Sequence, residues 1–371
     1  MFKKLSGINK LILVFNFIAV ALLFGAYLSL VVSPSFFYPL AFLGLGFLII
    51  LFINLLFVLY WIILFKLHAL LSFTTILIGL FLFPRLLQLK SSKTEITSKT
   101  TGDSLVKVMS YNVRLFDLYN WTNNKKTRDR LFQFIKNQET DIANFQEFYS
   151  DDSNEFINVD SLKKKLGFTF SHVYYTTTLR NKNHWGIATL SKFPIIGKGN
   201  IKFNTKGNNS CIYSDIVKDK DTVRFYNIHL QSIHFKNEDY KFIDSLNNNR
   251  DVDEVKGTRK ILGKLKRAFV KRSIQVDLVI EHIKKSPYKV VVCGDFNDTP
   301  ISYTYQNFSE NLDDAFIQSG VGFGSTNNEI LPKRIDYVFH SRQIQSYSFK
   351  TIKSNLSDHY PLSVFVRMGK N

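Results

Sequence analysis

Hydrophobic positions are concentrated in the first 84 residues, which differ in kind from the rest of the chain. Residues 11–84 contain one formal charge, Lys66, and residues 1–84 contain no Asp or Glu. Three uncharged stretches, Leu11 to Val32, Phe36 to Phe65 and the shorter Leu67 to Phe83, approach or exceed the roughly 20 apolar residues that a membrane-crossing helix needs. A globular core cannot cover so many apolar residues, and a cleaved signal peptide would be shorter. We therefore expect a three-span anchor.

The charges that flank this anchor leave its orientation open. Three lysines near the N-terminus favour a cytoplasmic start, and three spans would then place the remainder of the chain outside the cytoplasm. Four basic residues after the last stretch favour the opposite arrangement. The two groups are Lys3, Lys4 and Lys10, and Arg85, Lys90, Lys93 and Lys99. We expect an integral, multi-pass protein with an extracytoplasmic C-terminal domain; a third stretch that fails to cross would make that domain cytoplasmic.

Beyond the anchor, the pattern changes to short apolar runs that alternate with amphipathic segments. Ser91 to Ser104 is rich in Ser, Thr and Lys without periodicity, so we divide the chain into an anchor (1–84), a linker (85–104) and one α/β domain (105–371). Predicted strands are Val106–Asn112, Ile142–Gln146, Trp185–Ser191, a short one at Phe193–Ile195, two within Ile201–Val217, and Val223–Leu230. Thr127–Asn137 is predicted as an amphipathic helix.

A long helix is predicted from Glu254 to Lys285, because apolar residues recur there at helical spacing. Its other face is basic, with Lys264, Lys266, Arg267, Lys271 and Arg272. A solvated face is the simplest interpretation. The alternatives are contact with acidic lipid headgroups or with a phosphorylated substrate.

Charge narrows the choice of partners without deciding it. All 30 acidic residues and 44 of the 48 basic residues follow residue 84, so this part carries +14 of the total charge of +18. A basic surface of this kind suits anionic lipids and the phosphate backbone of nucleic acids equally well.

Polar residues end or open the strand-like runs, and these positions carry the candidate chemistry. Oxygen ligands suit a hard cation such as Mg²⁺, and histidines beside them suit the negative charge of a phosphate. The combination indicates metal-assisted cleavage of a phosphate ester. The blocks are Ser110–Asn112, Gln146–Glu147, Asn227–Leu230, Gly294–Asp298, Arg334–Tyr337 and Ser357–Leu362.

In their order and spacing, these six blocks resemble the endonuclease/exonuclease/phosphatase superfamily, which includes DNase I, abasic-site endonucleases, inositol-polyphosphate 5-phosphatases and neutral sphingomyelinases. The resemblance covers about residues 105–368. It implies a four-layer α/β sandwich, two packed mixed β-sheets flanked by helices, here preceded by an all-α transmembrane anchor. Abasic-site endonucleases carry a tyrosine where this chain has His229, so the likeness is closer to the phosphodiesterase and phosphatase branches.

The resemblance also implies a metal site. Glu147 is similar to the family's principal Mg²⁺ ligand, Asn112 would lie beside the ion, and Asp358 would bind it directly or through water. Mg²⁺ keeps several waters and needs only one or two protein carboxylates, which is consistent with this small set. The expected cofactor is Mg²⁺, with Mn²⁺ as the alternative.

The implied catalytic residues come from the other blocks. Asp295 would orient or deprotonate the attacking water, and Asn297, two residues on in an extended segment, would hold that water or a phosphate oxygen. His229 and His359 would flank the scissile phosphate, with Asp336 keeping His359 charged and oriented. The carboxylate partner of His229 stays open.

The resemblance therefore predicts a metal-dependent phosphoric ester hydrolase, a phosphodiesterase or phosphatase tethered to the membrane. Tethering raises the effective concentration of a lipid-linked or membrane-associated phosphate substrate. Some bacterial members with N-terminal spans act on polyprenyl phosphates, and the similar layout implies a bacterial-type cytoplasmic membrane. The expected partners are the lipid bilayer and the phosphate ester, with no obligate protein partner evident.

Two alternatives remain. The basic domain suits a membrane-anchored endonuclease or exonuclease that acts on nucleic acid. A non-catalytic membrane scaffold or receptor is the second, and it is disfavoured because every expected polar position is occupied.

Overall fold

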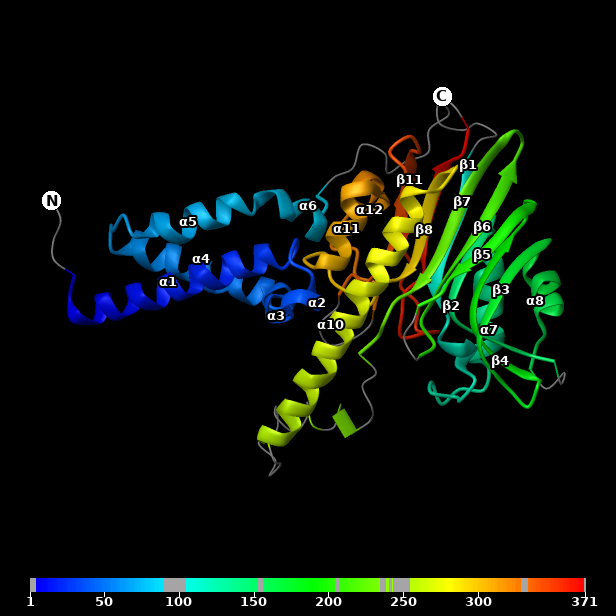
Figure 1. The fold of residues 1–371 in the computed structure, drawn as a ribbon, viewed down its shortest axis with the longest axis horizontal. Coiled ribbons are helices and arrows are strands. Elements are labelled where there is room, and N and C mark those ends of the chain that lie inside the picture. Colours follow the sequence, from blue (N-terminus) through cyan, green and yellow to red (C-terminus); the bar gives the residue numbers. More distant parts are fainter. Residues whose placement is uncertain are drawn as a thin grey trace. The chain divides into compact units, whose positions relative to one another are not determined.

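The computed structural model describes residues 5–89, 105–152, 156–203, 207–233, 238–239, 242, 254–327 and 333–369 (Figure 1). The described residues form two compact units. We call the first the anchor unit; it draws on Met1–Leu86, Ile233–Ser273 and Thr299–Gln306. The second, the sheet unit, draws on Leu87–Ser232, Ile274–Asp298 and Asn307–Asn371.

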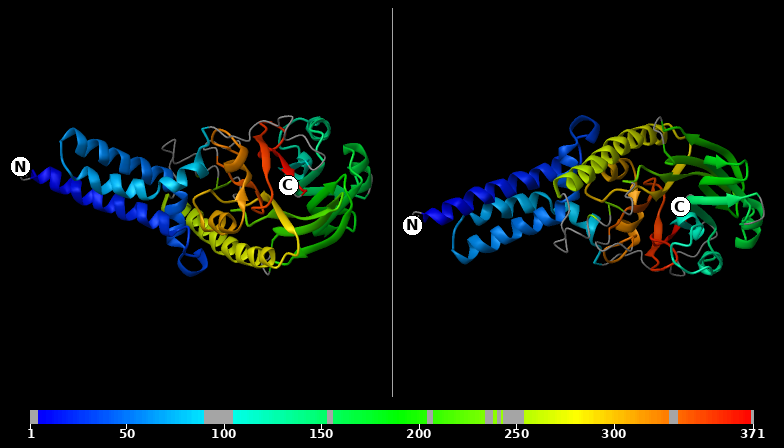
Figure 2. Two further views of the ribbon diagram at one scale, coloured as in Figure 1. Left: turned by 90° about the horizontal axis from the view of Figure 1, so that it is seen from above. Right: turned by 90° about the horizontal axis from the view of Figure 1, so that it is seen from below.

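The anchor unit begins with a run of apolar helices. They are α1 (Gly7–Leu28), α2 (Pro34–Phe37), α3 (Pro39–Leu45), α4 (Phe47–Ile63), α5 (Ala69–Ile78), the 3₁₀ turn η1 (Leu80–Leu82) and α6 (Phe83–Leu86). Helices α1, α4 and α5 lie side by side in both views of Figure 2. Of the described helices, α1 alone is long and apolar enough to cross a membrane by itself. The number rises to three if each bent pair, α3 with α4 and α5 with η1 and α6, counts as one span.

The second apolar stretch of the sequence, Phe36 to Phe65, is broken rather than continuous. Helices α3 and α4 meet at an angle of 69°. Pro39, at the start of α3, has no N–H with which to continue a preceding helix, and Gly46 leaves the helical conformation at ψ 5°. Helix α4 has 17 residues, the short end of the range that spans a bilayer. The three-span anchor therefore stays a prediction.

Polar side chains of the anchor unit point inward and join its helices. Asn16 of α1 donates from its amide to Ser72 Oγ of α5 (2.6 Å), and Ser72 Oγ donates to Asn54 Oδ1 of α4 (2.8 Å). Trp61 Nε1 donates to Asn16 Oδ1 (2.9 Å). These four residues are fully buried, whereas many large apolar side chains of the same helices are exposed. Polar groups inside and apolar groups outside invert the pattern of a water-soluble bundle.

The sheet unit contains two mixed six-stranded sheets. The first has the strand order β11-β12-β1-β2-β4-β3 and the second β5-β6-β7-β8-β10-β9. The pairs β1·β2 and β7·β8 are parallel, and the other pairs are antiparallel. The strands are β1 (Leu105–Asn112), β2 (Ile142–Asp151), β3 (Phe170–Leu179), β4 (Asn183–Ser191), β5 (Ile195–Ile201), β6 (Ser210–Lys218), β7 (Asp221–His229), β8 (Lys289–Asp295), β9 (Asp313–Asp314), β10 (Asp336–His340), β11 (Ser346–Thr351) and β12 (Leu362–Arg367).

Helices flank this pair of sheets. Their bounds are η2 (Arg114–Asp117), α7 (Thr127–Asn137), α8 (Val159–Leu166), α10 (Glu254–Lys284), α11 (Tyr303–Asn311) and α12 (Ala315–Ser319). Apolar residues of α7 and α8 pack with β1 and β2 in one core cluster, so these helices cover the outer face of the first sheet. A second cluster contains Val108 and Leu362 of the first sheet with Phe225 and Val291 of the second, and it lies between the sheets. The expected sandwich of two packed mixed sheets flanked by helices is confirmed.

Several local predictions hold and others fail. Helix α7 has the predicted bounds, and α10 ends within one residue of its predicted end. The prediction of two strands within Ile201–Val217 is wrong: that range contains only the end of β5 and most of β6, with residues 204–206 outside the described part. Most of the predicted linker, residues 90–104, also lies outside the described residues.

Candidate active site

Three of the expected catalytic residues share one row of the second sheet. His229 ends β7 and is the register partner of Asp295, which ends β8. Asp336 begins the antiparallel neighbour β10 and is the partner of Asp295 on its other side. Because β10 runs opposite to β7 and β8, its start meets their ends, and all three side chains lie at one edge of the sheet.

A glycine allows this row to form. Gly294 has φ +152°, a conformation that favours glycine, and a Cβ at this position would lie 2.0 Å from the carbonyl oxygen of Ile228. Just beyond, the N–H of Leu230 donates to the carbonyl oxygen of Asp295 (2.9 Å). Strands β7 and β8 therefore stay in close contact up to the point where His229 and Asp295 leave the sheet.

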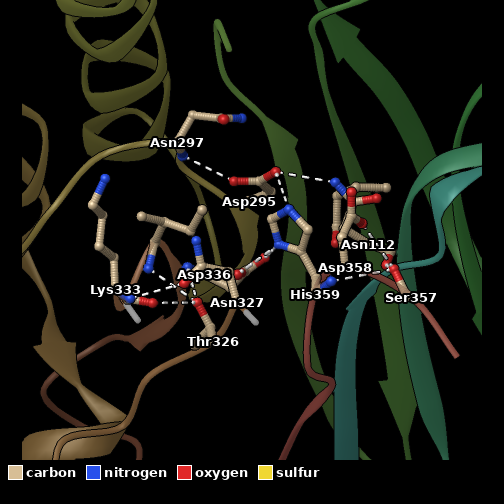
Figure 3. Close-up of polar contacts among 12 residues, drawn as sticks. Asn112, Asp295, Asn297, Thr326, Asn327, Lys333, Asp336, Ser357, Asp358 and His359 are labelled. Atoms are coloured by element: carbon tan, nitrogen blue, oxygen red, sulfur yellow. Dashed lines mark hydrogen bonds and ion pairs between the residues drawn. The ribbon is translucent and has the colours of Figure 1, made fainter. Parts of the chain in front are cut away.

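Strands and connections of the first sheet supply Asn112, Glu147, Asp358 and His359, and Figure 3 labels all of these but Glu147. Asn112 ends β1, and Asp358 and His359 lie in the connection between β11 and β12. Ser357 Oγ donates to the carbonyl oxygen of Asn112 (2.8 Å), which fixes that connection to the end of β1. Glu147 sits in β2 with φ +47°, where the pairing between β2 and β4 shifts register. Such a bulge re-aims a side chain at the edge of a sheet.

Asp295 joins the two halves of the site. Its Oδ2 accepts a hydrogen bond from the amide of Asn112 (3.0 Å), and its Oδ1 accepts one from the N–H of Asn297 (2.9 Å). The residue is almost completely buried. Two donors therefore hold this carboxylate in one orientation (Figure 3).

Asn297 is brought into the same loop but not in the expected way. Its φ of +54° places it in a left-handed turn, so the expectation of an extended segment is wrong. An Asx turn explains the difference, because the carboxylate of Asp295 captures the N–H two residues on. The side-chain amide of Asn297 donates to the carbonyl oxygen of Leu230 (3.1 Å).

His359 and Asp336 form a buried pair. Nδ1 of His359 lies 2.9 Å from Oδ2 of Asp336, and the Asp336 N–H donates to Thr326 Oγ1 (3.1 Å). Burial alone lowers the pKa of His359, but the carboxylates of Asp336 and Asp295 outweigh it and hold that pKa well above its ordinary value. Burial raises the pKa of the Asp336 carboxyl, and His359 opposes that rise. The imidazole of His359 thus favours its charged form.

Both histidines face Asp295. Nε2 of His229 lies 3.8 Å from Asp295 Oδ2 and 3.9 Å from Glu147 Oε1, and Nε2 of His359 lies 3.8 Å from the same Asp295 oxygen. The structure thus places His229 between two carboxylates, each beyond hydrogen-bonding distance. Its buried Nε2 has no hydrogen-bond partner among the described residues. A polar group left in this state is suited to a ligand oxygen.

The Glu147 carboxylate lies among other negative groups. Partial burial of the side chain raises its pKa, and Asp358 and Asp295 raise it further, while His229 and His359 act in the opposite direction. The Glu147 side chain keeps 37% of its surface exposed, and that of Asp358 keeps 42%. Two partly open carboxylates, close to the further carboxylate of Asp295, form a site that a cation would stabilise.

The residues present fit a hard divalent cation. Carboxylate oxygens of Glu147 and Asp358 and the amide oxygen of Asn112 are the donor types that Mg²⁺ and Mn²⁺ accept. One tighter group of possible ligand atoms occurs among the described residues: donors of Asp295, Asp336 and His359 all lie within 4.8 Å of one another. The hydrogen bond to Asp336 already occupies Nδ1 of His359, which makes this group less suited to a metal.

Sequence reasoning missed Arg114. Its Nε lies 3.2 Å from Asp358 Oδ2, its N–H donates to Asn112 Oδ1 (3.1 Å), and its guanidinium lies 4.8 Å from the ring centre of Trp121. A basic residue two positions after Asn112 was the available signal. Arg114 therefore brings a positive charge to the edge of the candidate metal site.

Sequence reasoning also missed a polar bridge between the sheets. Nε2 of Gln146, in the first sheet, donates to Oδ1 of Asn227 in the second (2.6 Å). Asn227 in turn donates to the carbonyl oxygen of Ala188 (2.9 Å). Both side chains are completely buried, one residue away from Glu147 and two from His229. The bridge therefore holds the two halves of the site at a fixed separation.

Several solved protein structures have a fold similar to that of this chain. The chain resembles an endonuclease/exonuclease/phosphatase from Bacteroides vulgatus (18% identity, TM-score 0.53, 71% of this chain and 99% of that one). It also resembles an endonuclease/exonuclease/phosphatase from Beutenbergia cavernae (15% identity, TM-score 0.51, 72% of each chain). The human Nocturnin catalytic domain is similar too (16% identity, TM-score 0.50, 72% of this chain and 94% of that one). At these identities the likeness concerns the fold alone. No curated protein matches the chain.

Two family models match the sequence. Residues 9–86 match a domain of unknown function. Residues 109–359, more than half of the chain and including every residue of the candidate site, match the model of the Endonuclease/Exonuclease/phosphatase family. The chain therefore belongs to the Endonuclease/Exonuclease/phosphatase family.

Proposed function

We propose that this protein is a divalent-metal-dependent phosphoric ester hydrolase that uses Mg²⁺ and is attached to a membrane. One observation carries the proposal: the imidazoles of His229 and His359 both lie 3.8 Å from the Asp295 carboxylate, and His229 lies 3.9 Å from that of Glu147, so groups from both sheets meet at one site. Family membership supports the class of reaction, because members of this family are hydrolases that act on phosphate esters.

The roles of the residues follow from their surroundings. Bound at Glu147, Asp358 and Asn112, the cation would supply a Lewis acid for the phosphoryl oxygens. Asp295, held by two donors, is positioned to accept a proton from the attacking water. The charged imidazole of His359 and the unpartnered Nε2 of His229 would stabilise negative charge on the phosphoryl group.

The surface of the anchor unit supports membrane attachment. Its polar residues Asn16, Asn54 and Ser72 are buried while its outward surface is apolar, an arrangement that suits hydrocarbon better than water. The anchor would contain three spans if each bent helix pair crosses the membrane. The basic residues before α1 support an extracytoplasmic sheet unit of a bacterial-type cytoplasmic membrane.

A lipid-linked or otherwise membrane-associated phosphate is the substrate class that we favour. Ile301 is buried in one cluster with Leu23 and Ala26 of α1 and Phe47 of α4. Only three residues separate Ile301 from Asn297 in the sequence, so the tether at this point is short. Membrane attachment raises the effective concentration of a substrate in the same bilayer.

Hydrolysis of a generic phosphodiester by the full-length protein tests the reaction class. Bis(p-nitrophenyl) phosphate is offered to detergent-solubilised protein with and without Mg²⁺, beside Asp295→Asn, His359→Ala and the control Asp219→Asn, whose side chain is exposed. We expect Mg²⁺-dependent release that both site variants lose and the control keeps. Equal inertness of all four proteins across substrates would favour the non-catalytic scaffold.

A second comparison tests the substrate class. The same protein, reconstituted in nanodiscs, receives a polyprenyl phosphate in its own bilayer or a single-stranded oligonucleotide in solution. Faster turnover of the lipid is the expected result. Preference for the oligonucleotide would reassign the protein as a membrane-attached nuclease, and it would leave the reaction class intact.

A further inference from the structure

The first half of α10, residues 254–273, carries a concentrated positive charge within the anchor unit. Eight of its residues are Lys or Arg and one, Glu254, is acidic. Five of the basic side chains are exposed, and Lys264 and Lys271 are half-buried. The exposed ones are Lys256, Arg259, Lys260, Lys266 and Arg267.

One face of this segment docks onto the anchor helices. The ring of Phe269, 4% exposed, makes a T-shaped contact with Phe42 of α3 at 5.2 Å between centroids. The ammonium of Lys266 lies 4.2 Å from the centre of the Tyr38 ring. Tyr38 and Phe42 follow shortly after the end of α1, which among the described helices is the one long and apolar enough to cross a membrane by itself. These contacts fix the first half of α10 beside the end of the apolar helices.

The docked helix presents a second, mixed stripe. Val255, Arg259, Leu262 and Lys266 are spaced by four, three and four residues, so they lie in one row along the helix. All four are exposed, including the apolar Val255 (79%) and Leu262 (46%). The row ends at Tyr38, whose chain neighbour Phe37 is also exposed. Alternating apolar and basic residues are typical of helices that lie in a membrane interface.

Within the described residues, only part of the positive charge of this surface is paired with carboxylates. Lys260 pairs with Glu238 (3.2 Å) and Asp239 (3.5 Å), and Lys264 pairs with Asp239. Within the part of the chain that the structure describes, no carboxylate pairs with the basic residues Arg259, Lys266, Arg267 or Lys271. A partner with several negative charges on an apolar layer would match both features of the surface.

We propose that the first half of α10 is an interfacial helix that binds the anionic phospholipid headgroups of the leaflet at the α2–α3 end of the anchor unit. The stripe Val255–Arg259–Leu262–Lys266 would insert its apolar members at the level of the acyl chains and place its cations among the phosphates. This inference rests on the membrane attachment proposed above and is independent of the phosphoesterase reaction. It assigns to the basic face a partner other than the substrate.

Hydrogen exchange of full-length protein in nanodiscs tests the proposal. Peptides that cover residues 254–273 are compared in phosphatidylcholine alone and with about 30 mol% phosphatidylglycerol, and in the mixed bilayer we expect exchange at least about threefold slower. The double variant Arg259→Gln/Lys266→Gln should lose this protection. Because Lys266 also contacts Tyr38, a second variant, Arg259→Gln/Arg267→Gln, removes two cations without a described partner and should lose most of it.

The control is Lys220→Gln/Lys284→Gln, which removes two exposed lysines of the sheet unit and should keep the wild-type response. Equal exchange of wild type in the two bilayers would overturn the proposal, as would failure of the protein to enter nanodiscs. Protection by a single-stranded oligonucleotide equal to that by phosphatidylglycerol would assign the face to nucleic acid instead. Hydrolysis of the soluble phosphodiester is measured in parallel, so that loss of the lipid response and absence of the reaction remain distinguishable.

Discussion

The imidazole of His359 and the carboxylate of Asp336 lie 2.9 Å apart, although they are 23 positions apart in the chain. They come from different sheets: Asp336 begins β10, and His359 precedes β12. The pair therefore links the two sheets at the rim of the site, and its ionisation is tied to the folded state.

This link predicts a pH-dependent stability. The pKa of His359 is higher in the folded protein than its ordinary value near 6.5. The stabilisation of the folded state by the charged imidazole is therefore fully present below about pH 6.5, and it is lost as the pH rises through the raised folded pKa. In metal-free protein we expect the free energy of unfolding of wild type to exceed that of His359→Gln by at least about 1 kcal/mol at pH 6 and by less at pH 9. Thermal unfolding across this range measures the difference. A gap that widens with pH would contradict the assignment.

Asp295→Asn should abolish most turnover while the fold is kept. The amide cannot accept the proton of the attacking water, and loss of a general base typically costs about 10²- to 10⁴-fold in rate. Steady-state hydrolysis of the generic phosphodiester at saturating Mg²⁺ gives kcat, with Asp219→Asn as the exposed control. A variant that retains more than about a tenth of wild-type kcat would remove Asp295 from the mechanism.

Glu147→Gln should lower the affinity for Mg²⁺ more than it lowers the stability of the fold. We expect the Mg²⁺ concentration for half-maximal activity to rise by about 10- to 100-fold. Without metal, loss of a charge close to Asp358 and Asp295 relieves repulsion, so the unfolding temperature should not fall. Mg²⁺ titration of activity and thermal unfolding in EDTA check the two parts. An unchanged Mg²⁺ curve would exclude Glu147 as a ligand.

Arg114→Gln should act on the metal in the opposite direction. The guanidinium neutralises Asp358 at 3.2 Å, so its removal leaves a more negative site and should lower the half-saturating Mg²⁺ concentration several-fold. The ion pair is partly exposed, and its loss should cost less than about 1 kcal/mol of stability. Mg²⁺ titration of activity and thermal unfolding in EDTA measure these two effects. A higher half-saturating Mg²⁺ concentration in Arg114→Gln would show that the residue orders the site rather than competing with the ion.

Asn227→Ala should destabilise the sheet unit. The substitution leaves buried Nε2 of Gln146 without its main acceptor, which typically costs about 1–3 kcal/mol. Urea unfolding of the full-length protein, followed by near-ultraviolet circular dichroism, measures the change against the exposed control Asn208→Ala. Wild-type stability in Asn227→Ala would mean that water or a neighbouring group replaces the bridge.

Elements with a strong local pattern could be predicted from the sequence, and elements that depend on distant contacts could not. Helix α7 was predicted with its observed bounds because its apolar residues hold a clear helical period. Strand β3 was not predicted, since most of its residues are half-buried and it contains the polar run Thr176–Thr178. The break at Gly46 escaped notice because every residue around it is apolar.

The same limit applies to the candidate site. The positions of Glu147, Asp295 and His359 could be anticipated because each lies in a block that resembles a known family. The neighbours of His229 could not, because Glu147 belongs to one sheet and Asp295 to the other, and their distances depend on how the sheets pack. Arg114 was missed for a similar reason, since Asp358 is 244 residues away in the sequence.

The division of the site between two sheets has a practical consequence. Neither sheet alone carries both the candidate metal ligands and Asp295, the proposed acceptor of the proton of the attacking water, so a partly folded chain with intact strands but loosened packing should be inert. Catalysis would then fade before secondary structure does on gentle heating or in mild urea. Turnover of a simple chromogenic ester could thus serve as a sensitive gauge of tertiary integrity in detergent preparations, where spectroscopy is dominated by helices.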